Sequence, residues 1–351
     1  MQYRLLGRSG LRVSEVCLGT MTFGEGNGAD YGANGAVSAE MFDAYLEAGG
    51  NFIDTANVYT RGESETIVGD LIAPHRDRIV LATKYTFTRA DGDPNSGGNH
   101  RKNLVQSLEK SLRKLKTDYI DVYWVHAWDF TTPVDELMRA LDDQVRAGKV
   151  LHVGISDAPA WVVSQANTLA LLRGWSPFIA LQIEYSLVQR TVERDLIPMA
   201  RAFDLGICAW SPLGGGLLTG KYAVPDPPKT RRAVSVAPRI NDRNTEIVSR
   251  VVEIAGERGV SAAQVALAWV AQRGPDIVTI VGAKRVDQLL DNLGALTFRL
   301  TEDDVRRLDA ASAVDPGFPH QFLNNVREGR MPVSFSGVAA ASIRVPEGGV
   351  R

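Results

Sequence analysis

The stretch YIDVYWVHAWDFTTPVDELMRALDDQVRAGKVLHVGIS, residues 119–156, contains one complete unit of the fold. Residues 119–125 and 150–156 are rich in β-branched and aromatic side chains and too short for ordinary helices, so we expect them to be strands. The segment between them has helical periodicity, with Thr132 as the expected N-cap and Pro133 in the first turn. A strand, a helix and a strand in this order predict two parallel neighbours in one sheet.

The same alternation runs along the whole chain of 351 residues. Further strands are predicted at 14–19, 51–55, 78–83, 178–183, 206–210 and 276–282, with helical segments between them. Eight strands that alternate with helices predict a closed (β/α)8 TIM barrel rather than an open sheet. No long linker divides the chain, so we expect a single domain over residues 1–325 and a partly disordered C-terminal tail over 326–351.

Three long segments interrupt this rhythm at 23–35, 91–103 and 211–244, and each follows a predicted strand. In a barrel, such loops lie on the face at the carboxyl ends of the strands, where substrate sites are built. The first contains GEGNGA, a match to a dinucleotide-binding pattern, but further glycines precede the expected helix cap at Ser38. We therefore interpret GEGNGA as a loop.

Two segments near the C-terminus also depart from the simple alternation. A helix rich in small residues is predicted at 261–273, before the eighth strand, and we expect it to pack tightly. After Pro316 no clear periodicity remains, and the sequence GFPHQFL is expected to cover the mouth of the barrel.

Composition limits the class of protein. With 44% hydrophobic and 23% charged residues and a formal net charge of -2, the chain is typical of a soluble globular protein without general attraction to nucleic acid or anionic membranes. The N-terminus lacks a signal pattern, and no apolar run approaches the roughly 18 residues of a membrane span, so a cytoplasmic location is predicted. The two cysteines, Cys17 and Cys208, lie in apolar runs and are predicted core residues.

Polar or ionisable side chains end nearly every predicted strand. Alternation along the strands places Asp54, Lys84 and His126 on inward faces at the same mouth. Because a charge in a partly desolvated mouth is costly unless it is paired, Asp54 and Lys84 are expected to form an ion pair. Histidines 75, 100, 152 and 320 are interpreted as structural.

Tyr59 lies five residues after Asp54 and completes this group. A lysine near the phenol favours the phenolate, so Lys84 is expected to lower the pKa of Tyr59 and make it a proton donor, with His126 orienting the substrate oxygen. Patterns of serine hydrolases and zinc enzymes are absent from the sequence, and no metal is expected. A carbonyl oxygen that accepts a proton needs a hydride at its carbon, and a nicotinamide stacked on Trp210 is the natural source.

At these motifs the sequence resembles the aldo-keto reductase superfamily over nearly its whole length. The most specific stretches are DTANVY (54–59), LATKY, VYWVHAWD, LQIEYSLVQR, WSPLGGGLLTGKY and IVGAKRVDQLLDNLGA. The resemblance implies a (β/α)8 barrel that uses NADP(H) to reduce the carbonyl group of a small molecule. It also implies a catalytic tetrad of Asp54, Tyr59, Lys84 and His126.

The same resemblance implies a set of cofactor-binding residues. They are Gly19, Thr20, Met21, Asp54, Ser156, Asp157, Gln182, Trp210, Ser211, Leu213, Gly215, Lys221, Gly282, Lys284, Arg285, Gln288, Asp291 and Asn292. Asp157 stands where the family usually has asparagine, and its carboxylate accepts but cannot donate a hydrogen bond. Asp291 replaces the usual glutamate and has a shorter reach.

Lys284 and Arg285 immediately precede a predicted helix, so two cations and the positive end of the helix dipole meet there. This arrangement suits a 2′-phosphate and predicts a preference for NADPH over NADH.

A second class of function stays open: a barrel that binds the cofactor and regulates or organises a partner. The intact tetrad favours the enzyme, although a fold can outlive a change of role.

Overall fold

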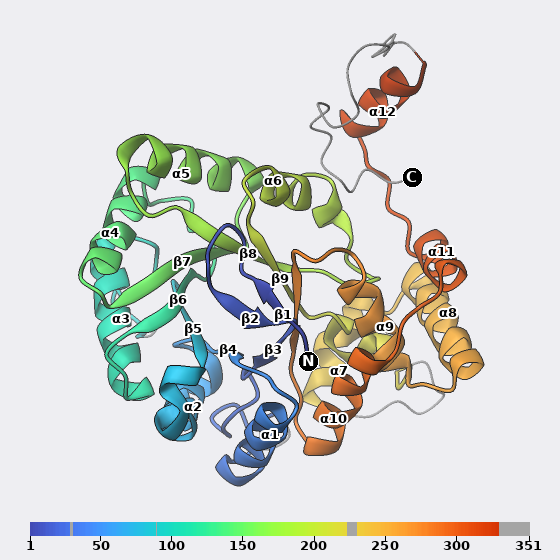
Figure 1. Ribbon diagram of the computed structural model, residues 1–351, viewed down its shortest axis with the longest axis horizontal. Coiled ribbons are helices and arrows are strands. Elements are labelled where there is room, and N and C mark those ends of the chain that lie inside the picture. The colour runs from blue at the N-terminus through green and yellow to red at the C-terminus, as the bar shows by residue number, and fades with distance from the viewer. Residues whose placement is uncertain (29–30, 89, 223–229, 330–351) are drawn as a thin grey trace.

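The computed structural model describes residues 1–28, 31–88, 90–222 and 230–329. Its centre is a closed barrel of parallel strands surrounded by helices (Figure 1). Around the barrel the strands follow one another as β10 (Ile277–Val281), β3 (Val16–Gly19), β4 (Phe52–Asp54), β5 (Val80–Tyr85), β6 (Ile120–Val125), β7 (Val150–Ser156), β8 (Phe178–Glu184) and β9 (Gly206–Trp210). The predicted single-domain (β/α)8 barrel is therefore confirmed, together with all eight strands.

The helices form the outer ring. They are α1 (Gly35–Glu47), α2 (Glu63–Ile72), α3 (Arg101–Leu115), α4 (Val134–Arg146), α5 (Ala160–Arg173), α6 (Leu196–Ala202), α7 (Arg231–Val236), α8 (Asp242–Arg258), α9 (Ala262–Ala271), α10 (Val286–Gly294), α11 (Glu302–Ala311) and α12 (His320–Gly329). Short 3-10 turns complete the described chain at η1 (Tyr59–Gly62), η2 (Ala73–Arg78), η3 (Thr191–Glu193), η4 (Gly214–Thr219), η5 (Ala237–Arg239) and η6 (Ala295–Thr297). The additional helix predicted before the eighth strand is α9.

Two predicted helix caps are wrong. Helix α1 begins earlier than expected because the Asn34 side chain accepts from the Val37 amide (3.0 Å), and Ser38 lies buried within the helix. In α4 the capping position is Pro133, not Thr132. The Thr132 hydroxyl instead donates to the carboxylate of Asp129 (2.7 Å), which belongs to the preceding turn, and it does not cap the helix.

A hairpin with no clear signal in the sequence precedes the barrel. Strands β1 (Tyr3–Leu5) and β2 (Arg12–Ser14) pair antiparallel, and Leu6 and Val13 pack into the barrel interior. Gly7 lies so close to the starts of β8 and β9 that a Cβ would come within 2.1 Å of the Ile179 carbonyl. The hairpin therefore closes the amino-end face and leaves the opposite face for the site.

The barrel interior is filled by alternate strand residues. Phe52, Ala82 and Trp124 occupy it directly beneath the predicted site, as the period of two requires. Cys17 and Cys208 are fully buried free thiols in the same cluster, so their predicted role as core residues is confirmed. Across the described ranges, no helix has the length and apolar character needed to cross a membrane.

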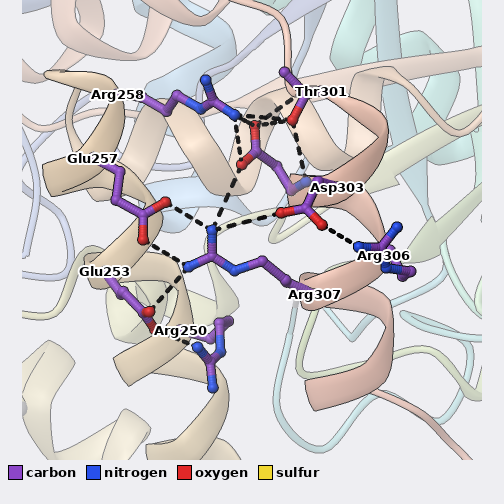
Figure 2. Close-up of polar contacts among 9 residues, drawn as sticks. Arg250, Glu253, Glu257, Arg258, Thr301, Asp303, Arg306 and Arg307 are labelled. Carbon is purple, nitrogen blue, oxygen red and sulfur yellow. Dashed lines mark hydrogen bonds and ion pairs between the residues drawn. The ribbon is translucent and has the colours of Figure 1, made fainter.

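Helix α11 is fastened to α8 by a network of ion pairs (Figure 2). Arg307 reaches both Glu253 (3.0 Å) and Glu257 (2.7 Å), and Arg258 contacts Asp304 (2.9 Å).

The expectation that GFPHQFL covers the barrel mouth is wrong. Helix α12 stands away from the ring of helices (Figure 1), and Phe318 is 88% exposed. His320 lies 3.0 Å from the carboxylate of Asp195, just before α6. Most of the predicted tail, from residue 330 on, lies outside the described residues, and its boundary at residue 325 stays a prediction.

Candidate active site

A buried ion pair occupies the centre of the carboxyl-end face. Lys84, at the end of β5, is fully buried and pairs with the carboxylate of Asp54, at the end of β4. Lys84 also donates to the Thr55 carbonyl (3.0 Å) and to the Tyr59 hydroxyl (3.0 Å). The predicted pairing of Asp54 with Lys84 is confirmed, and it offsets the cost of burying both charges.

The surroundings of Lys84 keep it protonated. Burial lowers the pKa of the ammonium group, but the charges and hydrogen bonds of Asp54 and Tyr59 outweigh burial, and the pKa is raised. Gln182, on β8, supports the pair from the far side, where its amide donates to the other Asp54 oxygen (3.1 Å). The site therefore holds one fixed cation and one fixed carboxylate.

Tyr59 is held by an unusual turn. Thr60 and Arg61 have left-handed backbones, with φ of 45° and 58°, and the Thr60 hydroxyl donates to the Phe23 carbonyl (2.5 Å). Left-handed backbone is unfavourable for a β-branched residue, so tertiary contacts must maintain the conformation. The turn sets the Tyr59 hydroxyl against Lys84 and links it to the loop after β3.

The predicted direction of the Tyr59 pKa shift is wrong. Burial is the largest effect and raises the pKa of the phenol, while Lys84 opposes it, and the net shift is upward. The phenol consequently keeps its proton at neutral pH and is available as a donor.

His126 follows β6 and faces Tyr59. The two rings meet edge to face with centroids 5.9 Å apart, and Phe87 packs against the other side of the imidazole at 4.4 Å. Burial, followed by the positive charge of Lys84, lowers the pKa of His126 well below its usual value, so the imidazole is neutral. Its Nδ1 atom finds no hydrogen-bond partner in the described part of the chain.

The ends of β7, β8 and β9 continue the mouth. Ser156 is buried, and its hydroxyl is unpartnered within the described ranges. Trp210 donates from its indole Nε1 to the carboxylate of Asp157 (3.1 Å), so β7 and β9 are joined across β8. An unpartnered buried hydroxyl beside an indole face fits a flat ligand that carries an amide, as a nicotinamide does.

The segment after β9 makes a tight glycine turn. Ser211 accepts from the Gly215 amide (3.0 Å), and Gly214, Gly215 and Gly216 all have positive φ. Leu213 directly precedes this turn. Lys221, beyond it, lies with its ammonium 5.1 Å from the centre of the Tyr222 ring.

Beyond β10, the predicted adenosine-side residues surround the start of α10. The Gln288 side chain accepts from the Lys284 amide (3.1 Å), and the exposed Arg285 forms an ion pair with Asp287 (2.8 Å). Asn292 is buried. The structure engages Asp291 elsewhere, because its carboxylate accepts from Ser261 (2.9 Å) at the start of α9.

The remaining predicted residues end or directly follow β3 and β10. Thr20 is buried and donates to the Asp54 carbonyl (3.1 Å), whereas Met21 is 37% exposed. Gly19 lies against β10, where a Cβ would come within 2.8 Å of Ile280. Gly282 has only the Gly19 carbonyl near its Cβ position, at 3.6 Å.

Several residues at the mouth were missed from the sequence. Phe87 contacts His126 and is 45% exposed, and the Trp128 amide donates to the Asp157 carbonyl (3.3 Å). Glu63 accepts from the amides of Glu25 (2.8 Å) and Gly26 (2.9 Å), so it anchors the first glycine-rich loop. Phe87 and Trp128 could have been found from the sequence, because they are aromatic residues three positions after Lys84 and two positions after His126.

Within the part of the chain that is described, no cluster of potential metal ligands is present.

The structure is a closed parallel barrel with buried polar side chains gathered at the carboxyl ends of its strands. The family model described as "Aldo/keto reductase family" matches residues 15–313. The chain is 39% identical over 330 residues to norsolorinic acid reductase of Aspergillus flavus. This alignment covers 92% of this chain and 84% of that protein. It is 35% identical over 336 residues to a putative aryl-alcohol dehydrogenase of Saccharomyces cerevisiae, with 92% and 89% of the two chains covered.

This protein belongs to the aldo/keto reductase family. It is an oxidoreductase of carbonyl and alcohol groups, which confirms the predicted family and the predicted class of enzyme.

Proposed function

We propose that the protein is an NADPH-dependent reductase of aldehydes or ketones in which Tyr59 is the general acid. The observation that carries the proposal is the hydrogen bond from Lys84 to the Tyr59 hydroxyl (3.0 Å), beside the buried pair of Lys84 with Asp54. A fixed cation next to a phenol stabilises the phenolate that remains after proton donation.

A bound nicotinamide would supply the hydride to the carbonyl carbon. Tyr59 gives its proton to the carbonyl oxygen, and Lys84 stabilises the resulting phenolate while Asp54 keeps Lys84 charged and in place. The neutral His126 donates an N–H to the same oxygen and orients it. No other ionisable group is required at the reacting atoms.

The cofactor would lie across the strand ends. We assign the carboxamide to Ser156 and Gln182, with Trp210 stacked on the ring, because Ser156 is otherwise unpartnered among the described residues. The turn of Ser211, Leu213 and Gly215, with Lys221 beyond it, takes the pyrophosphate, and Gly19, Thr20, Met21 and Gly282 form the floor of the site. Gln288 and Asn292 flank the adenosine, while Asp291 acts indirectly by tying α10 to α9.

Lys284 and Arg285 would bind the 2′-phosphate and give the preference for NADPH. The Arg285 guanidinium already holds a carboxylate, that of Asp287, through two hydrogen bonds (2.9 and 2.8 Å). This geometry also suits a phosphate, which must displace Asp287 to bind there.

We further propose an aromatic carbonyl substrate. Phe87 presents a half-exposed ring next to His126, where the carbonyl would be held. An aryl group stacked there would place its carbonyl carbon within the mouth. A relative of 39% identity from Pestalotiopsis microspora is named aryl-alcohol dehydrogenase, which agrees with this choice.

The test is to follow NADPH consumption with matched aromatic and aliphatic aldehydes. The proposal requires turnover, with a higher kcat/KM for the aromatic member of each pair. Binding of NADPH without turnover of any carbonyl compound would instead favour the regulatory or scaffold function.

A further inference from the structure

We propose that Asp157 sets the balance between the two redox states of the bound nicotinamide, because its carboxylate favours the oxidised, positively charged ring over the neutral reduced ring. The inference rests on the proposed function, since it requires a nicotinamide at the mouth. In this proposal Asp157 influences whether reduction or oxidation is favoured, and it does so through the cofactor rather than through contact with the substrate.

The position of Asp157 is fixed by backbone and side chain together. Its amide donates to the Gln182 carbonyl (3.3 Å), and its carbonyl accepts from the Trp128 amide (3.3 Å). Its φ of 43° turns the chain sharply at the end of β7. The carboxylate then meets the indole of Trp210 (3.1 Å), at the edge of the surface on which the ring would stack.

Within the described ranges, the charge of Asp157 faces the open site without a cation of its own, and its side-chain hydrogen bond comes from the neutral Trp210 indole. Among the described residues it forms no ion pair, and its side chain is exposed at the mouth. Lys84, whose charge lowers the pKa of Asp157, is already paired with Asp54. The neighbouring carboxylate of Glu184, at the end of β8, is paired with Arg239, although its charge still helps to raise the pKa of Asp157.

The carboxylate is ionised in neutral and alkaline solution. Partial desolvation raises the pKa of Asp157 to about 6, against the opposing hydrogen bond from Trp210. Above that pH a negative charge remains beside the ring position. His126, which shares the mouth, is neutral and does not compensate it.

The chemistry follows from the two forms of the cofactor. Oxidation of an alcohol moves a hydride to the ring and releases one proton, so the oxidised ring carries a positive charge that the reduced ring lacks. A carboxylate near the ring therefore strengthens binding of NADP⁺ and leaves NADPH nearly unaffected. By linkage, stabilisation of bound NADP⁺ shifts the equilibrium on the enzyme toward NADP⁺ and the alcohol, which favours carbonyl reduction.

The experiment compares Asp157→Asn with the unaltered protein by calorimetric titration of NADP⁺ and NADPH separately, at pH 8. Asparagine tolerates a left-handed backbone and keeps an oxygen for the Trp210 indole, so the fold and the stacking surface are retained. We expect the ratio of the Kd for NADP⁺ to the Kd for NADPH to rise about tenfold. Asp157→Gly, which also fits the backbone, should give the same shift.

Glu184→Gln is the matched control, because it removes a neighbouring carboxylate that is paired with Arg239. It should leave the ratio of the two constants unchanged. If Asp157→Asn and Asp157→Gly bind both forms with the unaltered ratio, the inference is overturned. If the unaltered protein binds neither form, the proposed function itself fails.

Discussion

Lys84 donates a hydrogen bond to the Tyr59 hydroxyl over 3.0 Å while its charge is held by Asp54. One buried cation thus connects the end of β5 with the carboxylate of β4 and with the turn that follows it. The phenol gains a partner that stabilises its deprotonated form, even though burial raises its pKa. This relationship explains how a protonated tyrosine can also be an efficient acid.

Tyr59→Phe removes the proton and leaves the ring. Since the phenyl group still packs against His126, the mouth keeps its shape and cofactor binding should be unchanged. Turnover should fall by roughly two to four orders of magnitude, as expected for loss of a general acid. Steady-state kinetics and a separate NADPH titration measure the two effects, and a near-normal kcat would reject the assignment.

Lys84→Met leaves the buried carboxylate of Asp54 without its cation. The free energy of unfolding should fall by about 3–5 kcal/mol, measured by urea denaturation. The charge of Lys84 opposes the upward shift of the Tyr59 pKa that burial causes. Without Lys84 this pKa should rise further, so the alkaline limb of any residual activity should move to higher pH.

The double variant Asp54→Asn/Lys84→Met is the control for this prediction. With both charges removed, most of the lost stability should return, but turnover should not. An equal loss of stability in the single and double variants would argue against the ion pair as the cause.

Arg285→Ala should raise the Kd for NADPH by about tenfold or more and leave the Kd for NADH almost unchanged, because only NADPH carries the 2′-phosphate. Quenching of tryptophan fluorescence measures both constants. Arg306→Ala, on the exposed face of α11, is the control and should alter neither. Equal weakening of the two cofactors would contradict the proposed phosphate contact.

Asp129 joins the loop before α3 to the turn before α4. Burial raises the pKa of this carboxyl, but bonds from the Asn99 and Thr132 amides and the Thr132 hydroxyl outweigh it and lower the pKa to about 2. A lowered pKa in the folded state stabilises the protein above the unfolded value of about 3.9, and the effect is lost as the pH falls toward about 2.

Asp129→Asn should therefore lower the free energy of unfolding at pH 7 by about 1–2 kcal/mol, after allowance for solvent screening. The difference from the unaltered protein should shrink as the pH falls below about 4, when urea denaturation is repeated across a pH series. Asp118→Asn, at an exposed position, should show neither effect.

Arg307→Ala removes the centre of the network between α8 and α11 in Figure 2. The melting temperature should fall, and 1 M salt should reduce the difference because it screens exposed ion pairs, with a Debye length of about 3 Å. Arg306→Ala removes a more exposed neighbour that contacts Asp303, and it should have a much smaller effect. Equal melting temperatures for the two variants would contradict a stabilising role of Arg307 in the contact between α8 and α11.

The barrel and the side chains at its mouth could be predicted from the amino-acid sequence alone. Short apolar runs that alternate with helical segments leave few ways to bury both faces of a parallel sheet, and period two decides which residues point inward. Asp54, Lys84 and His126 were identified in this way. Short segments such as β1 and β2 were missed because three residues carry too little pattern.

The pKa shifts at the site and the partners that are distant in sequence depend on the folded barrel and could not be predicted from the sequence. The pKa of Tyr59 depends on burial against Lys84, and burial is produced by segments distant in sequence. The bond between Asp157 and Trp210 spans three strands, and the attachment of Asp291 to Ser261 depends on how α9 packs on α10. Local sequence records which face a side chain occupies, whereas its partners and its dielectric surroundings follow from contacts that exist only once the barrel has closed.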